Sequence, residues 1–435
     1  MNAIVIFAIL SVLLIAGKIL RMQLPLLQKL YLPSSVVGGI LGLGLLTAFP
    51  HLISPELVCE MRLMPGFLIN VIFATLFLGA ALPKIQDFAS SVFAQLTLAQ
   101  IVVWGQYVVG LGLCGFMLMP IFKVHPAFGN LLELGFEGGH GTVGGMSQAF
   151  VAKNWSDGIA LGYTIATVGM IVGIVLGMAL VNWAYRRGLV KTVRPFADRS
   201  MAERRGIHLR GRRPSAGQQT VASDSVDSLA WHIAIVGISV LIGWGLWHLV
   251  PLQGFPLFPL CMMGGVILQL VARAFRIDLF IDRTQMERIS GAALDFLALS
   301  AIATIEISVV VANWMPLAIM IVGGIVWTIF AILFLGPRLF KTAWFERAIA
   351  EFGQATGVTA TGLLLLRTVD PEGKTPASAS FAGKQLLHEP VMNLWVALAF
   401  ALIFTIGWLK VFLICAGVLA AWLIVAVILM RRAQK

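Results

Sequence analysis

Long hydrophobic stretches recur along the whole chain and are separated by shorter polar segments. Many of them reach about 20 residues, the length that an α-helix needs to cross a bilayer. The pattern therefore predicts an all-α polytopic membrane protein with eleven spans. The expected spans cover residues 2–17, 34–50, 64–82, 95–121, 159–185, 230–250, 256–274, 291–311, 314–336, 387–408 and 411–430.

The composition agrees with a membrane protein and excludes the soluble globular class. Hydrophobic residues make up 59% of the 435 and charged residues only 12%, whereas a soluble protein carries about 25% charged residues. The four cysteines are far apart and form no Cys-x-x-Cys pair: Cys59, Cys114, Cys261 and Cys415. They predict neither a disulfide framework nor a structural metal site, and we expect them to fill apolar space.

Positive charge is concentrated in one segment of the chain. Between Arg186 and Arg213 there are ten Lys and Arg residues and two acidic residues, which gives +8 of the total net charge of +11. No nucleic-acid motif accompanies this charge, so nucleic acid is not an expected partner. Cytoplasmic loops are rich in Lys and Arg, and residues 188–229 are therefore predicted to form a flexible cytoplasmic linker that can also contact membrane lipid. In the inner (plasma) membrane, this arrangement places the N-terminus outside and the C-terminus in the cytoplasm.

Three short motifs recur in the same order on both sides of the linker, which predicts an internal repeat. The pairs are Pro33-x4-Gly38-Gly39 with Pro259-x4-Gly264-Gly265, Phe67-Leu68-x5-Ala74-Thr75 with Phe296-Leu297-x5-Ala303-Thr304, and Phe136-x4-Gly141 with Phe352-x4-Gly357. Because each half holds five spans, the second half is expected upside down relative to the first. The predicted domains are a first repeat over 1–187, a second repeat over 230–408 and an additional C-terminal helix over 409–435.

A polar, glycine-rich stretch, Gly135–Gly145, interrupts the apolar pattern of the first half. It holds six glycines, a glutamate, a histidine and a threonine within eleven residues. Glycine weakens helices and charge is costly in lipid, so we expect a re-entrant loop at about 128–150 rather than a span. A second re-entrant loop is predicted at about 345–366, and the two tips are expected to meet near the midplane. Tight helix packing is the alternative explanation for the glycines.

Side chains of the first loop suit a small anion and a cation. Glu137 can bind a cation or a proton, and His140 can donate to a substrate carboxylate or carry a proton. A buried histidine that only supports the loop is the alternative for His140. Hydroxyl oxygens suit a hard cation such as Na⁺, which makes Thr142 and Ser147 candidate ligands.

The second loop and one span supply the remaining candidates. Neutral oxygens and amide donors that suit a substrate recur in the second loop: Gln354, Thr356, Thr359 and Thr361. Arg367 can clamp a substrate carboxylate, or it can anchor the helix at the cytoplasmic interface. Glu306 is predicted to lie inside a span, where an acidic side chain indicates a functional role such as Na⁺ binding.

The two loops, the repeated Pro-x4-Gly-Gly motif and the basic linker together resemble the glutamate:sodium symporter (ESS) family. The local matches are Gly138-Gly139-His140-Gly141-Thr142, similar to the family's first re-entrant loop, and Tyr31-Leu-Pro33-Ser-Ser-Val-Val-Gly38-Gly39, similar to its Pro-Glu-Pro-Val-x-Gly-Gly stretch. The resemblance covers about residues 1–408 and implies a homodimer that carries L-glutamate with Na⁺ in an elevator-like motion. It places seven residues at the substrate and ion site: Gly138, Gly139, Gly141, Thr142, Gly357, Thr359 and Thr361.

The sequence also departs from the family pattern. Ala360 stands between the two threonines of the second loop where the family has proline, and Ser34 stands where the family tends to have an acid. Glu351 and Arg367 are charges that the pattern does not predict. These differences leave the fold expectation intact and extend the expected substrates from glutamate to related small carboxylates and amino acids.

The leading hypothesis is therefore a Na⁺-coupled symporter of a small anion, with Na⁺ as the coupling ion and no other cofactor. The expected Na⁺ ligands are Glu137, Thr142, Ser147, Thr359 and Glu306. A proton-coupled carboxylate carrier that uses His140 or Glu137 is a close alternative, and a membrane channel or scaffold is an alternative of a different class. An enzyme is not expected, because no His-Glu-x-x-His or Gly-x-Ser-x-Gly motif occurs.

Overall fold

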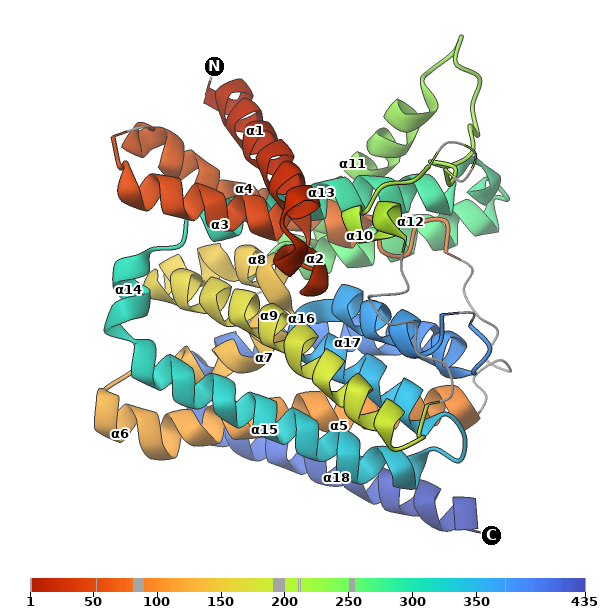
Figure 1. Ribbon diagram of the computed structural model, residues 1–435. Coiled ribbons are helices and arrows are strands. Elements are labelled where there is room, and N and C mark those ends of the chain that lie inside the picture. The colour runs from red at the N-terminus through yellow and green to blue at the C-terminus, as the bar shows by residue number, and fades with distance from the viewer. Residues whose placement is uncertain are drawn as a thin grey trace. The chain divides into compact units, whose positions relative to one another are not determined.

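The computed structural model describes residues 2–51, 53–80, 90–190, 200–209, 211, 213–249, 255–371 and 373–434. These residues form helices joined by turns and loops, and no strand occurs among them (Figure 1). The prediction of an all-helical protein is confirmed.

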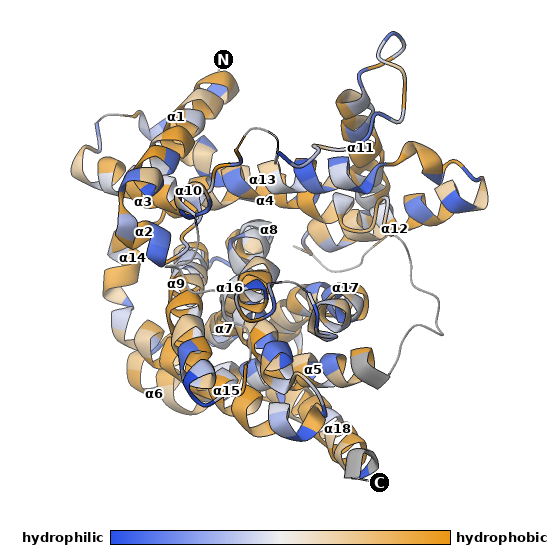
Figure 2. Ribbon diagram, turned by 45° about the vertical axis from the view of Figure 1, so that its right-hand side comes forward, coloured by the Kyte–Doolittle hydropathy of each residue, from blue (hydrophilic) through white to orange (hydrophobic). Residues whose placement is uncertain are grey.

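Nine helices in the described part of the chain are long and apolar enough to cross a membrane. They are α1 (Asn2–Gln23), α4 (Pro55–Thr75), the continuous α5–α6 segment (Val92–Phe122), α9 (Asp157–Arg186), α11 (Ser228–Trp247), α15 (Trp314–Leu339), α16 (Trp344–Val369), α17 (Ala377–Thr405) and α18 (Trp408–Gln434). Two apolar helices are shorter: α3 (Ser34–Ala48) and α12 (Phe258–Ala274). Hydrophobic residues cover most of the long helices (Figure 2). The chain is an integral membrane protein.

Several predicted spans are shifted relative to their helices: α4 begins before residue 64 and ends before residue 82, α17 begins before residue 387, and the span over 291–311 is divided. Instead of a helix over 291–311, α13 (Arg283–Ala303) starts earlier and ends at Ala303, and α14 (Ile307–Ala312) follows after a break. The early start has a local cause, because the side chain of Asp282 caps the helix by accepting from the backbone N–H of Gln285 at 2.8 Å. The first half of α13 is polar, so the helix is not among the nine apolar ones.

Two compact units divide the chain, and each draws segments from both halves of the sequence. Unit 1 comprises Met1–Leu82, His140–Ser156 and Ser200–Ile305. Unit 2 comprises Pro83–Gly139, Asp157–Arg199 and Glu306–Lys435.

In unit 1, the repeated Pro-x4-Gly-Gly motif makes the same type of contact twice. A Cβ added to Gly38 of α3 would lie 2.5 Å from the backbone oxygen of Leu13 in α1, and one added to Gly264 of α12 would lie 2.1 Å from that of Ser239 in α11. No side chain fits at either place, which explains why both positions are glycine. The recurrence supports an internal repeat, while the inverted insertion of the second half stays a prediction.

The following glycine of each motif continues the parallel. A Cβ on Gly39 would approach the backbone oxygen of Leu299 in α13 at 3.1 Å, and one on Gly265 would approach that of Ala74 in α4 at 2.4 Å. The second repeated motif, which ends in Ala74-Thr75 or Ala303-Thr304, thus supplies part of the surface against which the first motif packs.

Part of the basic linker is ordered against unit 1. Its short helix α10 (Met201–Arg205) begins with a capping box formed by Ser200 and Glu203. The ammonium of Lys18 in α1 donates to the carbonyls of Arg205 and Gly206 at 3.1 and 2.8 Å. A cation at the carboxyl end of a helix stabilises it, so these contacts favour the helical form of this part of the linker, whose flexibility stays a prediction. Residues 191–199, 210 and 212 of the predicted linker lie outside the described residues.

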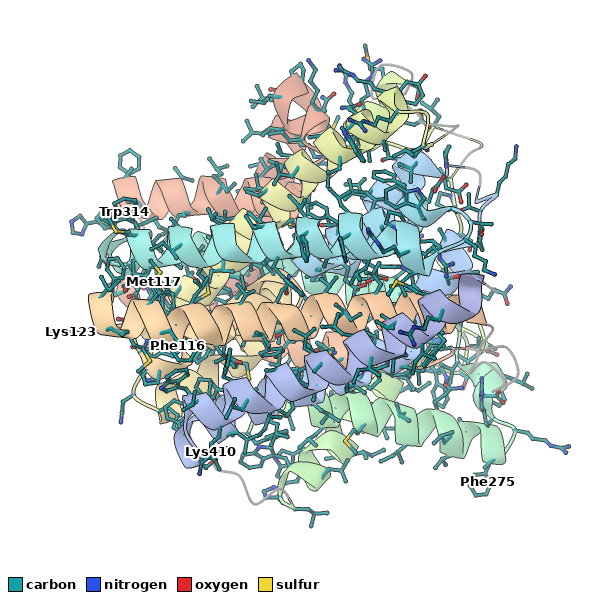
Figure 3. The ribbon with its side chains drawn as sticks, turned by 90° about the horizontal axis from the view of Figure 1, so that it is seen from below. Phe116, Met117, Lys123, Phe275, Trp314 and Lys410 are labelled. Carbon is teal, nitrogen blue, oxygen red and sulfur yellow. The ribbon has the colours of Figure 1, made fainter. Side chains whose placement is uncertain are left out.

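In unit 2, α5 (Ser90–Leu113), α15 and α18 lie side by side (Figures 1 and 3). Lys123, Trp314 and Lys410 lie at the same end of these helices (Figure 3). The side chain of Trp314 is 60% exposed. Tryptophan and lysine are typical of a membrane–water interface, so this end of the helices suits such an interface.

Candidate functional site

The first predicted loop contains a short break between two helices. Helix α7 (Leu131–Phe136) ends before Glu137, and α8 (Gly139–Ala152) begins two residues later. Gly139 has a φ of +66°, which favours glycine. The interruption is thus confined to Glu137 and Gly138, and most of the glycine-rich stretch is helical.

Helical glycines of α8 serve close packing within unit 1. A Cβ on Gly141 would lie 2.5 Å from Cδ1 of Ile69, and one on Gly145 would lie 2.3 Å from Cδ1 of Phe258. These two glycines therefore fit the packing explanation that the sequence left open. His140 and Thr142 are also buried in unit 1, and the hydroxyl of Ser147 donates to the carbonyl of Val143 at 3.3 Å.

The second predicted loop is a sharp reversal inside α16. Gly357 (φ −158°, ψ 38°) and Val358 (φ 62°, ψ 171°) are not helical. A Cβ added to Gly353 would lie 2.7 Å from the Cα of Gly362. Residues nine apart in a continuous helix are about 13 Å apart along the axis, so α16 folds back into two arms, 344–356 and 359–369. This shape supports the predicted hairpin, whose entry into the membrane from one side stays a prediction.

Buried polar side chains of unit 2 meet at the carboxylate of Glu137. Its Oε1 accepts from Nε2 of Gln354, on the first arm of α16, at 3.0 Å. The same oxygen forms a short contact with Nε2 of His388 in α17. Nδ1 of His388 lies 3.0 Å from Nε2 of Gln100, and Oε1 of Gln100 accepts from the indole N–H of Trp104 at 2.7 Å.

These contacts determine which atoms donate. An indole nitrogen only donates, so the Gln100 amide presents its oxygen to Trp104 and its NH₂ group to His388. Nδ1 of His388 therefore accepts, and the ring proton lies on Nε2, which donates to Glu137. Glu137 is an acceptor in both of its side-chain contacts.

A buried ion pair adjoins Gln354. The ammonium of Lys384 in α17 donates to Oε2 of Glu351 and to Oε1 of Gln354, both at 2.9 Å. Lys384 is fully buried and Glu351 is 2% exposed. Gln95 of α5 donates to Glu351 at 2.6 Å and accepts from Nε of Arg347 at 3.0 Å. Buried charged side chains inside a membrane protein indicate a functional site.

The second arm of α16 contacts another carboxylate on α17. The hydroxyl of Thr359 donates to Oε1 of Glu389 at 2.9 Å. Gln385 donates to both of these oxygens, at 2.8 Å to Thr359 and 3.0 Å to Glu389. Nδ2 of Asn393 lies 3.2 Å from Oε2 of Glu389. Adjacent residues Lys384 and Gln385 thus hold opposite arms of the hairpin.

Glu133 adds a fourth carboxylate to unit 2. It lies one turn before Glu137 and is 2% exposed. The phenol of Tyr107 in α5 donates to its Oε2 at 2.6 Å. Both Glu137 and Glu389 are near enough to act on it electrostatically.

The structure thus places three of the predicted site residues in polar clusters of unit 2: Glu137 and Gln354 share one cluster, and Thr359 belongs to a second, half-buried cluster at Glu389. Thr361 is buried in the second arm, and Thr356 donates to the carbonyl of Phe352 at 2.7 Å within the first arm. Gly138 follows Glu137 in the break, and Gly357 lies at the reversal.

Arg367 and Glu306 also lie outside these clusters. Arg367 is exposed in the second arm. Glu306 is half-buried in the break before α14, not inside a helix, because α13 ends at Ala303. No group of three or more His, Cys, Asp and Glu side chains in the described ranges is arranged to hold a metal ion.

Sequence reasoning missed the contributions of α17 and α5, and one residue each of α7 and α16. The missed residues are Gln95, Gln100, Tyr107, Glu133, Arg347, Lys384, Gln385, His388, Glu389 and Asn393. A signal was present, because two polar stripes run along α17 at four-residue intervals: Ser380, Lys384 and His388, and Gln385, Glu389 and Asn393. The predicted span began at residue 387 because the first part of α17 is polar.

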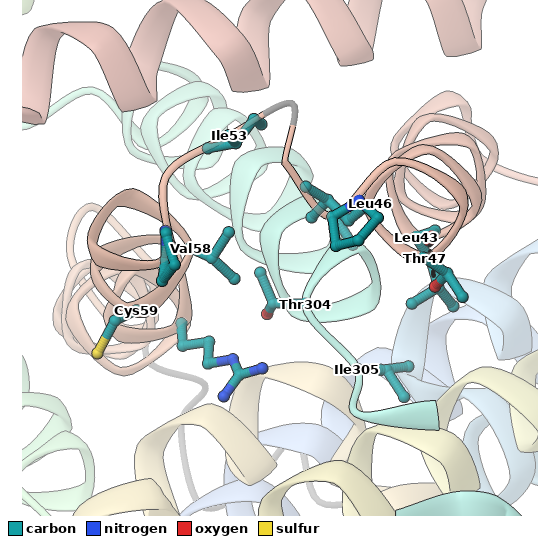
Figure 4. A pocket seen from close by; sticks show the side chains of 12 residues that line it. Leu43, Leu46, Thr47, Ile53, Val58, Cys59, Thr304 and Ile305 are labelled. Carbon is teal, nitrogen blue, oxygen red and sulfur yellow. Dashed lines mark hydrogen bonds between the residues drawn. The ribbon is translucent and has the colours of Figure 1, made fainter. Parts of the chain in front are cut away.

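Unit 1 contains a pocket of about 340 Å³ at the ends of α3, α4 and α13 (Figure 4). Most of its lining is apolar, with Leu46, Val58 and Ile305 among the side chains. Thr47, Arg62 and Thr304 add polar groups. Thr304 belongs to the second repeated motif, so this motif has a role at the pocket as well as in packing.

Comparison with known proteins identifies the family. A family model described as sodium/glutamate symporter matches residues 1–344 of the 435. A search of curated proteins finds no match. The match covers most of the chain, including the glycine-rich stretch and both Pro-x4-Gly-Gly motifs. The chain therefore belongs to the sodium/glutamate symporter family.

Proposed function

We propose that the protein is a secondary active transporter that couples the movement of Na⁺ to that of glutamate or a related small carboxylate or amino acid. The observation that carries this proposal is the buried network of charged side chains around the hairpin of α16. Such charges destabilise a membrane protein unless they serve a polar substrate or ion.

The chemistry of the network suits a small anion accompanied by a cation. Lys384 on α17 and Arg347 on the first arm supply positive charge, and the reversal at Gly357–Val358 leaves backbone groups outside the helical hydrogen-bond pattern. The substrate site is proposed to include the predicted residues of both loops, Gly138–Thr142 and Gln354–Thr361. A homodimer and an elevator-like movement are part of the proposal through the family resemblance.

A proton-coupled carboxylate carrier is the second candidate. The contact between His388 and Glu137 favours it, because an imidazole and a carboxylate that share a hydrogen bond can hold a transferable proton. In this version His388 takes the part that the sequence assigned to His140. A channel or scaffold is a third outcome that the same experiment separates.

The test is uptake of labelled L-glutamate into proteoliposomes, with an inward Na⁺ gradient, an inward proton gradient or neither. The Thr142→Ala variant is compared with Thr405→Ala, which changes an exposed threonine of α17. Uptake that requires Na⁺ and falls by at least about tenfold only in Thr142→Ala supports the proposal. Uptake driven by protons alone favours the second candidate, and gradient-independent flux at channel-like rates contradicts both.

A further inference from the structure

The pocket of unit 1 combines an apolar lining with one positive charge (Figure 4). It has a volume of about 340 Å³, lies at the ends of α3, α4 and α13, and shares no residue with the polar clusters of unit 2. Among the described residues that line it, Arg62 alone is charged. Glu60 belongs to the same helix but does not line the pocket, and it accepts from Nδ2 of Asn2 at 2.7 Å. The pocket therefore offers the hydrogen-bond donors of a cation in apolar surroundings.

The internal repeat identifies a matching place in the other half of the chain. Counted from the proline of the first repeated motif, Thr47 of α3 corresponds to Arg273 of α12. Thr304 after α13 and Thr75 at the end of α4 are the last residues of the second motif. The matching place thus lies where α12, the end of α4 and the start of α13 meet.

Main-chain oxygens occupy the matching place. Residues 76–80 follow α4, and Nη2 of Arg273 donates to the carbonyl of Ala80 at 2.9 Å. Nη1 of Arg283, the first residue of α13, donates to the carbonyl of Leu76 at 2.8 Å. Two arginines therefore bind the oxygens of a segment that joins three helices.

The chain takes a different course after Thr304. It continues through Glu306 into α14, which belongs to unit 2, and Ile305 is the only described residue after Thr304 that lines the pocket. No described segment of unit 1 thus takes the part that residues 76–80 have in the matching place. By analogy, we expect a separate molecule with oxygen acceptors to bind beside Arg62.

The position of Arg62 along α4 fits a lipid rather than a soluble anion. Helix α4 is apolar and long enough to cross a membrane, and Arg62 lies seven residues after its start at Pro55. This is about 10 Å along the helix axis, near the depth at which headgroups meet hydrocarbon. Apolar side chains such as Leu46 and Val58 line the pocket, and they suit the glycerol and the first acyl carbons of a lipid.

We propose that the pocket binds the phosphate of an anionic phospholipid, with Arg62 as the principal donor. A guanidinium has five N–H donors in a fork that matches a phosphate, so it can bind one in addition to contacts within the protein. The lipid would join the ends of α3, α4 and α13, as residues 76–80 join α4, α12 and α13. The proposal goes beyond the transport activity and does not depend on which substrate is carried.

The remaining polar groups select the headgroup. The hydroxyl of Thr47 donates to the carbonyl of Leu43 at 2.7 Å, and the hydroxyl of Thr304 donates within α13. Each hydroxyl oxygen therefore keeps the capacity to accept from a glycerol hydroxyl. The described lining has no carboxylate for the ammonium of choline, so phosphatidylglycerol should bind more tightly than phosphatidylcholine.

The test uses Cys59, which lines the pocket and is exposed, whereas the other three cysteines are buried. The full-length protein, purified in detergent and delipidated, is treated with a maleimide after addition of phosphatidylglycerol, phosphatidylcholine or inorganic phosphate. A lipid in the pocket covers the thiol, so phosphatidylglycerol should slow labelling by about tenfold at ten times its apparent dissociation constant. The midpoint of thermal unfolding is expected to rise with the same lipid, because the lipid binds the folded state.

Two matched variants make the result specific. Arg62→Gln removes the charge of the pocket and should weaken the apparent affinity for phosphatidylglycerol by at least about tenfold, because a charge-assisted hydrogen bond is lost. Arg62 is exposed, so this variant should fold. Arg276→Gln makes the same change at an exposed arginine after α12, away from the pocket lining, and should bind the lipid as the wild type does.

Several results would overturn the proposal. A wild type that phosphatidylglycerol does not protect would show that no such lipid binds. Equal protection by phosphatidylcholine would indicate general coverage by lipid, and protection by inorganic phosphate would indicate a site for a soluble anion. Wild-type protection of Arg62→Gln, or an equal loss in Arg276→Gln, would show that the arginine of the pocket does not hold the headgroup.

Discussion

Gly353 and Gly362 face each other across the two arms of α16, so closely that a Cβ on Gly353 would lie 2.7 Å from the Cα of Gly362. The hairpin depends on this contact, because backbone rather than a flexible side chain would meet the added carbon. Gly353→Ala is expected to destabilise the protein by about 1–3 kcal/mol, which is typical of overpacking. The measurement is the midpoint of thermal unfolding in detergent.

Gly417→Ala is the matched control for this change. Gly417 lies in α18, and a Cβ there would meet nothing within 4 Å. Alanine should therefore be neutral or slightly stabilising, because it favours the helix. Equal midpoints for the two variants would contradict the close approach of the two arms.

Val358 carries backbone strain at the reversal. Its φ of 62° and ψ of 171° are values that glycine adopts readily and that a β-branched residue avoids. Relief of such strain is worth about 1–3 kcal/mol, whereas the greater freedom of glycine in the unfolded chain costs about 0.5–1 kcal/mol. Val358→Gly should consequently raise the unfolding midpoint, and a lower midpoint would show that the side chain contributes more by packing than it costs in strain.

The ion pair of Lys384 with Glu351 provides a test of the buried network. Lys384→Met leaves Glu351 without its cation and is expected to destabilise the protein by about 3–5 kcal/mol. Adding Glu351→Gln removes the uncompensated charge, so the double variant should recover a part of this loss. The free energies of unfolding of the wild type, both single variants and the double variant form a double-mutant cycle. Strict additivity would mean that the two side chains do not interact.

The ordered part of the linker makes a prediction about proteolysis. Lys18 donates to carbonyls at the end of α10, and Arg21 donates to the carbonyl of Arg204 at 3.4 Å. Replacing Lys18 and Arg21 by glutamine should speed trypsin cleavage after Arg204 and Arg205 by several-fold, because cleavage requires the segment to leave α1. Lys29→Gln is the control, and an unchanged rate in the double variant would mean that the linker is not held by these contacts.

Much of the fold was predictable from hydrophobic length, because crossing a bilayer demands long apolar helices whatever the tertiary contacts are. The break at Glu137–Gly138 and the reversal at Gly357–Val358 were also predictable in position, since glycine and polar residues weaken helices there. What the pattern did not reveal is how narrow the first break is. Gly141 and Gly145 lie in a helix and allow close contact with Ile69 and Phe258. The sequence alone does not show which residues will be in such contact.

Only the part of the candidate site that belongs to the two glycine-rich loops was predictable from the sequence. The glycine-rich loops can be recognised from their own sequence, and this is how Glu137, Gln354 and Thr359 were predicted. Their partners Lys384 and Glu389 lie in a helix whose polar beginning resembles an extramembrane segment, and only the contacts with α16 show that these charges are buried or half-buried beside the hairpin. Hydropathy averages the polarity of a whole segment, so it does not show that a charged side chain within that segment faces another helix.

The interleaving of the two units has a consequence for biosynthesis. Ribosomes deliver the chain from the N-terminus, yet unit 1 needs residues up to Ile305 and unit 2 needs residues from Pro83 to the C-terminal helix. Helices α1, α3 and α4 are therefore synthesised before α11, α12 and α13, and the packing of unit 1 is complete only when all six are present. Contacts between segments so distant in sequence slow folding and leave glycine-lined surfaces exposed for a time. A nascent chain that stalls in the linker would hold neither unit complete, and it would be a natural substrate for membrane quality control.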